Sequence, residues 1–267
     1  MAYGFRMCHP EVPEGQPTPQ VTTEEVGVPL AGGETLPAML ALPDGGGPAP
    51  AVMVACDVFG RSPFYESLAA RIAQAGFEAL VPDFFFREGP LPERTREAAF
   101  ARRARMSEAR ALDDLRAALG WLRARPGHAG RIGTVGFCMG GTYVLDLSAM
   151  EPDLVTVCYY GFPAGPNQRT PTSPPAPIEL AAQMRGPILG FWGDQDAGVG
   201  MDNVAELARR LAEQGADFSH TVYPGLGHGF LAASQFDPSS DAYRAACESW
   251  TAALDLWRRH LRAAAVA

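Results

Sequence analysis

The chain has 267 residues, of which 47% are hydrophobic and 19% charged, a composition typical of a soluble globular protein. Its formal net charge of −8 at pH 7 and the lack of a Lys/Arg run argue against binding to nucleic acid or to an anionic membrane. Five scattered cysteines without a C-x-x-C pair indicate neither a disulfide framework nor a structural zinc site. Because no apolar leader follows Met1 and no apolar run could span a bilayer, we expect a cytoplasmic protein.

The first part of the chain predicts an arm and the edge of a sheet. Residues 1–20 contain several prolines among polar residues, and we interpret them as an arm on the surface. The segments 23–28 and 35–42 have strand character and are joined by a glycine-containing turn, which predicts an antiparallel edge hairpin. The continuous run of small apolar residues 49–55 is typical of a central parallel strand that is buried on both faces.

Helices and strands alternate through the rest of the chain. The expected helices are 62–75, 94–105, 107–125, the segment from Cys138 to about 150, 178–184, 201–214 and 241–262, and the further strands are 77–82, 131–135, 154–160, 187–192 and 218–223. This alternation predicts one α/β domain in which helices cover both faces of a mostly parallel sheet. In such sheets ligands bind at the carboxyl ends of the strands, so the polar residues there are the candidates for function.

One strand end has the pattern of a nucleophile elbow. The apolar run that begins at Arg131 leads into Gly136-Phe137-Cys138-Met139-Gly140-Gly141 and then into a helix, with cysteine where such turns usually have serine. Glycines flank the nucleophile in these turns because a Cβ would collide with the neighbouring strand and helix. The helix N-terminus would favour the thiolate form of Cys138. The alternative is that Cys138 is simply a small residue buried in a tight turn.

Two further strand ends carry an acid and a histidine. Asp194 and Asp196 follow the strand 187–192, and His228 lies between the last strand and the terminal helix. Nucleophile, acid and histidine therefore occur in the chain order of α/β-hydrolases. A histidine near Cys138 can hold or take the thiol proton, and a carboxylate fixes the imidazole tautomer. The residues alone leave open which aspartate is the acid, and His228 could instead be an ordinary polar loop residue.

Over nearly its whole length the chain resembles the dienelactone hydrolase family, which has the α/β-hydrolase fold. The matching segments are Cys56-Asp57-Val58-Phe59-Gly60, Pro82-Asp83 with Arg87, Gly136-Phe137-Cys138-Met139-Gly140-Gly141, Tyr159-Tyr160-Gly161, Gly193-Asp194-Gln195-Asp196 and Gly227-His228-Gly229-Phe230. The resemblance implies a single α/β-hydrolase domain and a catalytic triad of Cys138, Asp196 and His228. Asp194 is then expected to be a turn residue.

The resemblance also implies the surroundings of the nucleophile. Asp57 is expected beside Cys138, where it can receive the thiol proton, although the family more typically has glutamate and a shorter aspartate could merely order its loop. The backbone N–H groups of Met139 and Val58 are the expected oxyanion hole.

For substrate binding, the resemblance implies that Arg87 holds a substrate carboxylate. The family's second arginine falls at Ala232 in this chain, and Arg169 could substitute for it. The missing second arginine, together with Phe86 and Tyr160 near the same strand ends, predicts a pocket that is more apolar than a two-arginine site. In such a pocket we expect uncharged esters to compete with anionic ones. Whether residues 162–177 form a lid, and whether the chain is a monomer or a homodimer, remain open at this point.

The chemistry of a cysteine nucleophile narrows the expected substrates. A thiolate leaves more readily than an alkoxide, so its adduct with a simple alkyl ester tends to revert, whereas the enolate of an enol-lactone departs easily. We therefore expect hydrolysis of enol-lactones or other activated esters through a thioester, without a metal or an organic cofactor, and a small-molecule ester or lactone as the substrate. The alternatives are a broader carboxylesterase or thioesterase, and a ligand-binding protein without catalysis on the same fold.

Overall fold

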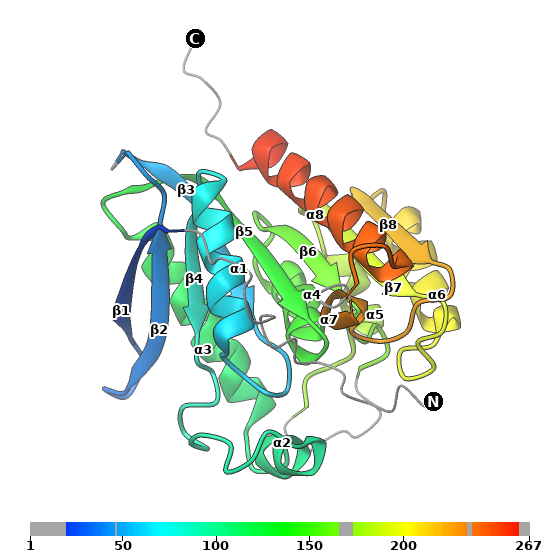
Figure 1. Ribbon diagram of the computed structural model, residues 1–267, viewed down its shortest axis with the longest axis horizontal. Coiled ribbons are helices and arrows are strands. Elements are labelled where there is room, and N and C mark those ends of the chain that lie inside the picture. The colour runs from blue at the N-terminus through cyan, green and yellow to red at the C-terminus, as the bar shows by residue number, and fades with distance from the viewer. Residues whose placement is uncertain (1–19, 46, 166–172, 234–236, 262–267) are drawn as a thin grey trace.

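The computed structural model describes residues 20–45, 47–165, 173–233 and 237–261. Within these residues, eight strands form one sheet in the order β1-β2-β4-β3-β5-β6-β7-β8 (Figure 1). The strands are β1 (Thr22–Pro29), β2 (Thr35–Leu42), β3 (Ala49–Ala55), β4 (Glu78–Pro82), β5 (His128–Phe137), β6 (Val155–Tyr159), β7 (Ile188–Gly193) and β8 (Phe218–Tyr223). All neighbouring pairs from β4 to β8 are parallel, as the alternation of strands and helices predicted.

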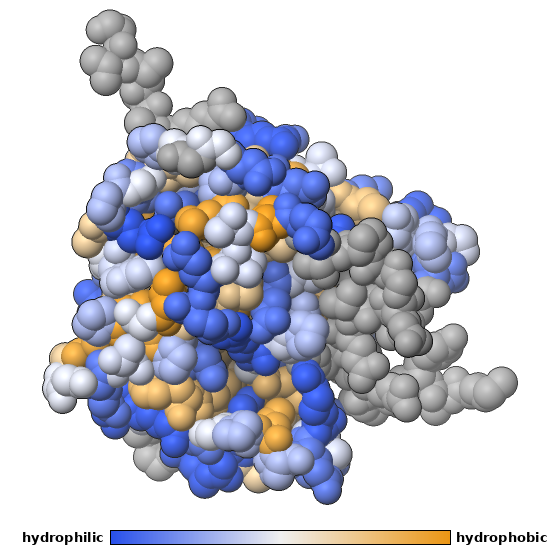
Figure 2. Space-filling model, turned by 60° about the vertical axis from the view of Figure 1, so that its left-hand side comes forward, coloured by the Kyte–Doolittle hydropathy of each residue, from blue (hydrophilic) through white to orange (hydrophobic). Residues whose placement is uncertain are grey.

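The hairpin β1–β2 forms the antiparallel edge of this sheet, which confirms the prediction for this segment. Its register runs from Thr22 opposite Leu42 to Pro29 opposite Thr35, and β2 continues antiparallel onto β4. Most residues of β1 are exposed, because the strand has one neighbour and shows its outer side to solvent. Figure 2 turns this side of the molecule forward and shows hydrophilic residues interspersed with smaller apolar areas.

Helices cover the sheet on both sides. They are α1 (Pro63–Gln74), α2 (Arg96–Arg103), α3 (Glu108–Arg123), α4 (Met139–Met150), α5 (Pro177–Leu180), α6 (Met201–Glu213), α7 (Phe230–Ala233) and α8 (Asp241–His260). In Figure 1, α1 and α8 lie in front of the sheet and α3 and α4 behind it. This arrangement agrees with the contacts of α1 with β4 and of α4 with β5 and β6.

The central strands are buried on both faces, as their composition indicated. Every residue of β4, β6 and β7 is buried, and β3 contains only alanine, proline, valine and methionine. Side chains of this kind suit a strand between two helical layers, because both of its faces exclude water. The two largest fully buried side chains are Trp192 on β7 and Trp257 on α8, and Trp257 lies against Gly133 of β5. Among the residues that the structure describes, no helix is both long enough and apolar enough to cross a membrane.

The ends of several elements agree closely with the sequence prediction. β2, β3 and β8 begin and end where the sequence indicated, and most other elements differ from it by one to three residues at an end. The short helix α7 was not predicted, because four residues are too few to show a helical period. The predicted arm (residues 1–20, apart from Gln20) falls outside the described residues, and so do residues 166–172 of the segment 162–177, for which a role as a lid was left open.

Candidate active site

Cys138 occupies a sharp turn between β5 and α4. Its backbone angles, φ 55° and ψ −116°, lie in a region that non-glycine residues rarely adopt, so the turn is strained at this residue. The flanking glycines allow the close packing that holds it there. A Cβ on Gly136 would come within 2.1 Å of the Gly140 carbonyl oxygen, and a Cβ on Gly140 within 2.2 Å of the Ala55 carbonyl oxygen. The elbow geometry that the sequence predicted is therefore present.

The turn places Cys138 at the N-terminus of α4, beside the ends of two neighbouring strands. Its backbone N–H donates to the carbonyl of Tyr159 at 3.1 Å, and its own carbonyl accepts from the N–H of Thr142 at 3.0 Å. Cys138 as a whole residue is 6% exposed, so it is shielded from bulk water but borders a cavity. A helix N-terminus favours negative charge in its first turn, which suits a thiolate at this position.

Asp196 and His228 are hydrogen-bonded to each other next to this thiol. The Nδ1–H of His228 donates to Oδ2 of Asp196 at 2.6 Å, and Oδ1 of the same carboxylate accepts from the Val199 N–H at 3.1 Å. Both oxygens of this buried carboxylate are thus engaged, and the imidazole orientation is fixed. Asp194, in contrast, is exposed, and its Oδ1 accepts from the Gly225 N–H at 2.7 Å within the turn.

The second nitrogen of His228 is the one available to the thiol. Nε2 is buried without a hydrogen bond of standard geometry to a described residue. Burial alone would lower the pKa of His228, but its interactions with Cys138 and Asp196 outweigh burial and raise the pKa to about 10. A thiolate at Cys138 would therefore keep the imidazole of His228 protonated at neutral pH.

Asp57 follows the end of β3, is completely buried and lies close enough to Cys138 for their charges to interact. Its Oδ1 accepts from the Phe59 N–H at 2.8 Å, whereas Oδ2 has no hydrogen-bond partner among the described residues. Burial and the charge of Cys138 raise the pKa of Asp57 well above its usual range. One oxygen thus orders the loop and the other is left for a proton, so both roles considered from the sequence are compatible with this geometry.

A cavity of about 580 Å³ opens at this end of the sheet, and Cys138, Asp196 and His228 all border it. Its other lining residues are mostly apolar or small: Val58, Phe59, Phe100, Met139, Thr142, Tyr143, Phe162, Pro174, Pro175, Ala176 and Pro177 are among them. Arg96, Arg103, Glu108 and Asp146 add charged groups to the wall. The buried guanidinium of Arg103 donates to Oε1 of Glu108 from Nε at 3.0 Å, so these two charges offset each other.

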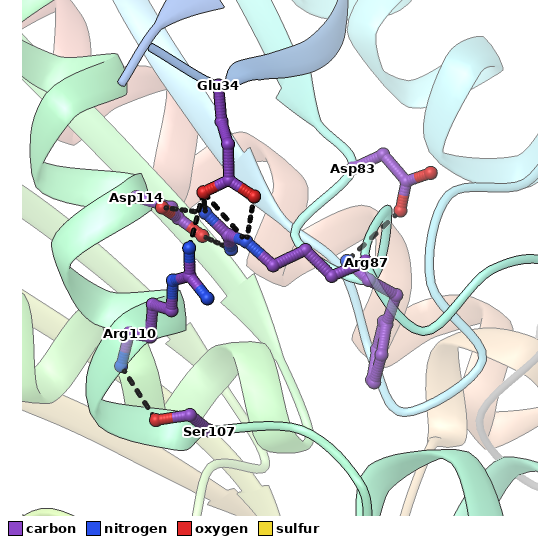
Figure 3. A network of polar contacts seen from close by, with 7 residues as sticks. Glu34, Asp83, Arg87, Ser107, Arg110 and Asp114 are labelled. Atoms are coloured by element: carbon purple, nitrogen blue, oxygen red, sulfur yellow. Dashed lines mark hydrogen bonds and ion pairs between the residues drawn. The ribbon is translucent and has the colours of Figure 1, made fainter. Parts of the chain in front are cut away.

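Arg87 does not line this cavity, contrary to the sequence expectation. Its guanidinium donates to both oxygens of Asp114 on α3 and, through Nη2 at 3.0 Å, to Glu34 in the β1–β2 turn (Figure 3). Arg110 on α3 also binds Glu34, and Figure 3 shows the four side chains converging on one point. The sequence spacing placed Arg87 correctly after β4, but the two carboxylates come from other parts of the chain and direct it away from the cavity.

Tyr160 and Phe86 also lie outside the cavity lining. The Tyr160 ring packs edge-on against the His228 imidazole, with 5.0 Å between the ring centroids, so it supports the histidine. Phe86 is half-buried under the Arg87 guanidinium, whose carbon lies 4.3 Å from the ring centroid. Of the expected site residues, the structure brings Cys138, Asp196, His228, Asp57, Met139 and Val58 together and leaves Arg87, Tyr160 and Phe86 out of the cavity wall.

The sequence did not single out the residues that shape the cavity away from Cys138. Phe100 and Arg103 come from α2, and Phe162 and Pro174 from the two ends of the segment after β6. The proline-rich composition of residues 162–177 was the one available signal, because it marked an insertion at the functional end of the sheet. Nothing in α2 distinguishes its cavity-facing residues from those of an ordinary amphipathic helix.

A mostly parallel sheet with a cysteine elbow, an acid and a histidine at its carboxyl edge defines an α/β-hydrolase fold. Comparison with known proteins gives the family. The model of the dienelactone hydrolase family matches residues 36–261, and the chain belongs to this family, as its sequence motifs implied. It is accordingly an enzyme of the dienelactone hydrolase type, a hydrolase of carboxylic esters.

Several individual proteins show the same relationship. The chain is 31% identical over 257 residues to the carboxymethylenebutenolidase of Rhodococcus opacus, covering 96% of this chain and 98% of that protein. It is 33% identical over 238 residues to a Bradyrhizobium protein named as a probable 2-oxo-3-(5-oxofuran-2-ylidene)propanoate lactonase, covering 86% and 91% of the two chains. A crystal structure from Klebsiella pneumoniae assigned to the dienelactone hydrolases superimposes with a TM-score of 0.81 at 29% identity, covering 90% of this chain and 99% of the other.

Proposed function

We propose that the chain hydrolyses enol-lactones and similarly activated carboxylic esters through a thioester on Cys138. The observation that carries the proposal is the position of His228, which is held by Asp196 on one nitrogen and borders the same cavity as Cys138. An oriented imidazole next to a thiol at a helix N-terminus is an arrangement suited to nucleophilic catalysis.

In the first half-reaction, the Cys138 thiolate attacks the lactone carbonyl carbon and the carbonyl π electrons move onto oxygen. The N–H groups of Met139 and Val58 stabilise this oxyanion, a contribution of about 10²–10³ in rate for each such donor. The ring C–O bond then breaks, and the departing enolate takes the proton of the His228 imidazolium. This leaves a thioester on Cys138 and a neutral imidazole.

In the second half-reaction, neutral His228 removes a proton from water as the water oxygen attacks the thioester carbon. The C–S bond breaks, the carboxylic acid is released, and the thiolate–imidazolium pair returns. General-base assistance of this kind contributes about 10²–10⁴ in rate. For Asp57 the scheme assigns a role in the resting enzyme, which then contains a Cys138 thiol, a His228 imidazolium and an Asp57 carboxylate. When substrate binds, the thiol proton moves to Oδ2 of Asp57, which has no hydrogen-bond partner among the described residues, and this leaves the thiolate–imidazolium pair that starts the cycle.

A chemical argument and the comparison with relatives both favour activated esters as the substrate class. A thiolate is a better leaving group than an alkoxide, so productive breakdown of the adduct needs a stabilised leaving group such as an enolate. The named relatives in Rhodococcus opacus and Bradyrhizobium act, by their names, on unsaturated lactones. We infer that this chain acts on substrates of the same chemical class.

A broader carboxylesterase activity is the second candidate, and the cavity is the observation that favours it. Its volume of about 580 Å³ and its lining of phenylalanine and proline can accommodate an aryl ester. Arg87, the arginine expected to select anionic lactones, is engaged elsewhere. Uncharged aryl esters should therefore compete with anionic lactones.

The direct test of both candidates is turnover of a panel of enol-lactones and activated aryl esters by wild type and Cys138→Ala. Hydrolysis of enol-lactones that disappears in the variant supports the proposal. Hydrolysis of aryl esters alone favours the broader esterase. If wild type turns over no member of the panel but binds one of them, the chain is a ligand-binding protein on a hydrolase fold.

A further inference from the structure

Arg102 on α2 is a buried cation that reaches the turn beside the nucleophile. Its side chain is deeply buried, with the whole residue 5% exposed. Nη2 donates to the Val58 carbonyl at 3.1 Å and Nη1 to the Gly89 carbonyl at 3.3 Å. The guanidinium also stacks on Phe85, with its carbon 3.9 Å from the ring centroid. Arg102 thus connects α2 to the loop that follows β3.

The stability of the fold does not by itself explain a guanidinium at this position. No ion pair to Arg102 is present among the residues that the structure describes, and its Nε has no hydrogen-bond partner there. Burial lowers the pKa of Arg102, and the charges of Asp83, Glu88 and Asp57, none of which forms an ion pair with it, oppose this only in part. Burying a charge without a paired carboxylate is costly, and an apolar side chain of similar length would fill the same space at lower cost. A role of Arg102 in the neighbouring site would explain why a charged side chain is buried here.

The contact with Val58 completes a set of hydrogen bonds around the turn Asp57–Gly60. The peptide group between Val58 and Phe59 is held at both ends, because its carbonyl accepts from Arg102 and its N–H donates to Asp57 Oδ1 at 2.8 Å. The Asp57 N–H donates to the Tyr65 hydroxyl at 3.1 Å, and the Gly60 N–H to the Asp57 carbonyl at 3.0 Å.

The Val58 N–H is the remaining backbone donor of this turn, and no described residue accepts a hydrogen bond from it. Val58 borders the cavity together with Cys138 and Met139. The turn therefore fixes every other backbone N–H and leaves one donor, that of Val58, at a residue that borders the cavity. Gly60, with φ +76°, closes the turn, and a Cβ there would lie 3.1 Å from Arg102 Nη2.

We propose that Arg102 is a positioning residue for the oxyanion hole. By holding the Val58 carbonyl, it fixes the rotation of the Val58–Phe59 peptide and, through it, the direction of the Val58 N–H. This inference rests on the proposed function, because it assigns Arg102 a role in stabilising the oxyanion of that reaction. A donor displaced by about 1 Å loses much of its effect on the transition state, which corresponds to roughly a 10²-fold loss of rate.

The experiment compares wild type, Arg102→Met and Arg105→Met in two reactions. Arg105 is the matched control, since it is exposed and also donates to backbone carbonyls, those of Ala101 at 3.2 Å and Glu88 at 3.4 Å. The first reaction is hydrolysis of an activated aryl ester, which forms an oxyanion in both half-reactions. The second is alkylation of Cys138 by iodoacetamide, a substitution at saturated carbon that forms no oxyanion and needs only a reactive thiolate.

We expect Arg102→Met to lower kcat by about 10–100-fold with KM changed less than threefold. Its rate of Cys138 alkylation should stay within twofold of wild type, and Arg105→Met should match wild type in both reactions. The inference is overturned if Arg102→Met keeps its kcat, or if alkylation slows as much as hydrolysis, because a general disturbance of the site would affect both.

A second variant keeps the inference testable if Arg102→Met does not fold. Arg102→Lys keeps the charge but lacks the fork that reaches two carbonyls, so its kcat should fall at least fivefold with alkylation unchanged; full kcat in this variant contradicts the inference. Failure of the proposed function has a different signature, since wild type would then hydrolyse no ester while Cys138 could still be alkylated.

Discussion

Arg87 donates to both oxygens of Asp114, and this pair ties the loop after β4 to helix α3. Asp114 is buried, with 5% of its side chain exposed, and the guanidinium of Arg87 donates to both of its oxygens. Glu34 and Arg110 extend the cluster toward solvent (Figure 3). Arg87, which the sequence suggested for substrate binding, thus belongs to a cluster of ion pairs that connects parts of the fold.

We therefore expect Arg87→Ala to reduce stability and to leave substrate charge preference unchanged. Removing the charged hydrogen bonds to a buried carboxylate should lower the free energy of unfolding by about 1.5–3 kcal/mol. Arg110→Ala, which removes an exposed partner of Glu34, should cost only about 0–1 kcal/mol. Urea unfolding measures both.

A matched pair of esters that differ by one carboxylate measures the preference itself. The ratio of kcat/KM for the anionic and neutral esters should be the same in wild type and in Arg87→Ala. A ratio that falls tenfold or more in the variant would show that Arg87 reaches the substrate after all.

The two aspartates of the loop after β7 should differ sharply in their effect on activity. Asp196→Asn removes the acceptor that orients His228 and should lower kcat by about 10²–10⁴-fold. Asp194→Asn alters a turn hydrogen bond to Gly225 and should cost less than fivefold. Steady-state kinetics measure kcat for both variants. A larger loss of kcat in Asp194→Asn than in Asp196→Asn would assign the acid to Asp194.

The protonation of His228 should persist to unusually high pH. Its pKa is raised to about 10, above the usual value of 6.5 in the unfolded chain. The stability that the imidazolium contributes is therefore fully present below about pH 6.5 and is lost as the pH rises through about 10. NMR of the imidazole ring protons measures the titration directly.

The charge of Cys138 is the expected cause of the raised pKa of His228, and removing the thiol tests it. In Cys138→Ala the charge interaction that raises the pKa is absent, so the titration of His228 should move to lower pH. An unchanged midpoint in the variant would mean that Asp196 alone sets the histidine's protonation.

Cys138 should be the fastest-reacting thiol of the folded chain. Burial raises the pKa of Cys56 well above its usual range and that of Cys158 to about 12, so neither forms a thiolate readily. Cys247 is exposed on α8 but lies beyond the first turn of that helix, whereas Cys138 lies at the N-terminus of α4, where negative charge is favoured. Mass mapping after brief alkylation should find the label on the peptide that contains Cys138, and first labelling of Cys247 would contradict this.

The sequence was informative where a local pattern determines the structure. The glycines around Cys138 predicted the elbow because the backbone geometry there excludes a Cβ, and the small apolar residues 49–55 predicted a strand buried on both faces. Each of these constraints involves residues that are close in sequence.

The sequence was uninformative where the answer depends on distant partners. Arg87 follows β4 as expected, yet Asp114 and Glu34, which are remote in sequence, determine where its guanidinium points. The cavity wall from α2 and the contact of Arg102 with Val58 likewise depend on how α2 packs beside the turn after β3. No sequence pattern within α2 predicts how the helix packs there.

The central claim, a thioester on Cys138, can be tested by trapping the intermediate. His228→Gln lacks the base for water attack, so an activated ester should acylate the variant and then deacylate slowly. Rapid quenching in acid followed by mass spectrometry should show one acyl group on the peptide that contains Cys138, and none in Cys138→Ala. Turnover that continues in Cys138→Ala with no acyl adduct on the wild-type peptide would contradict the account.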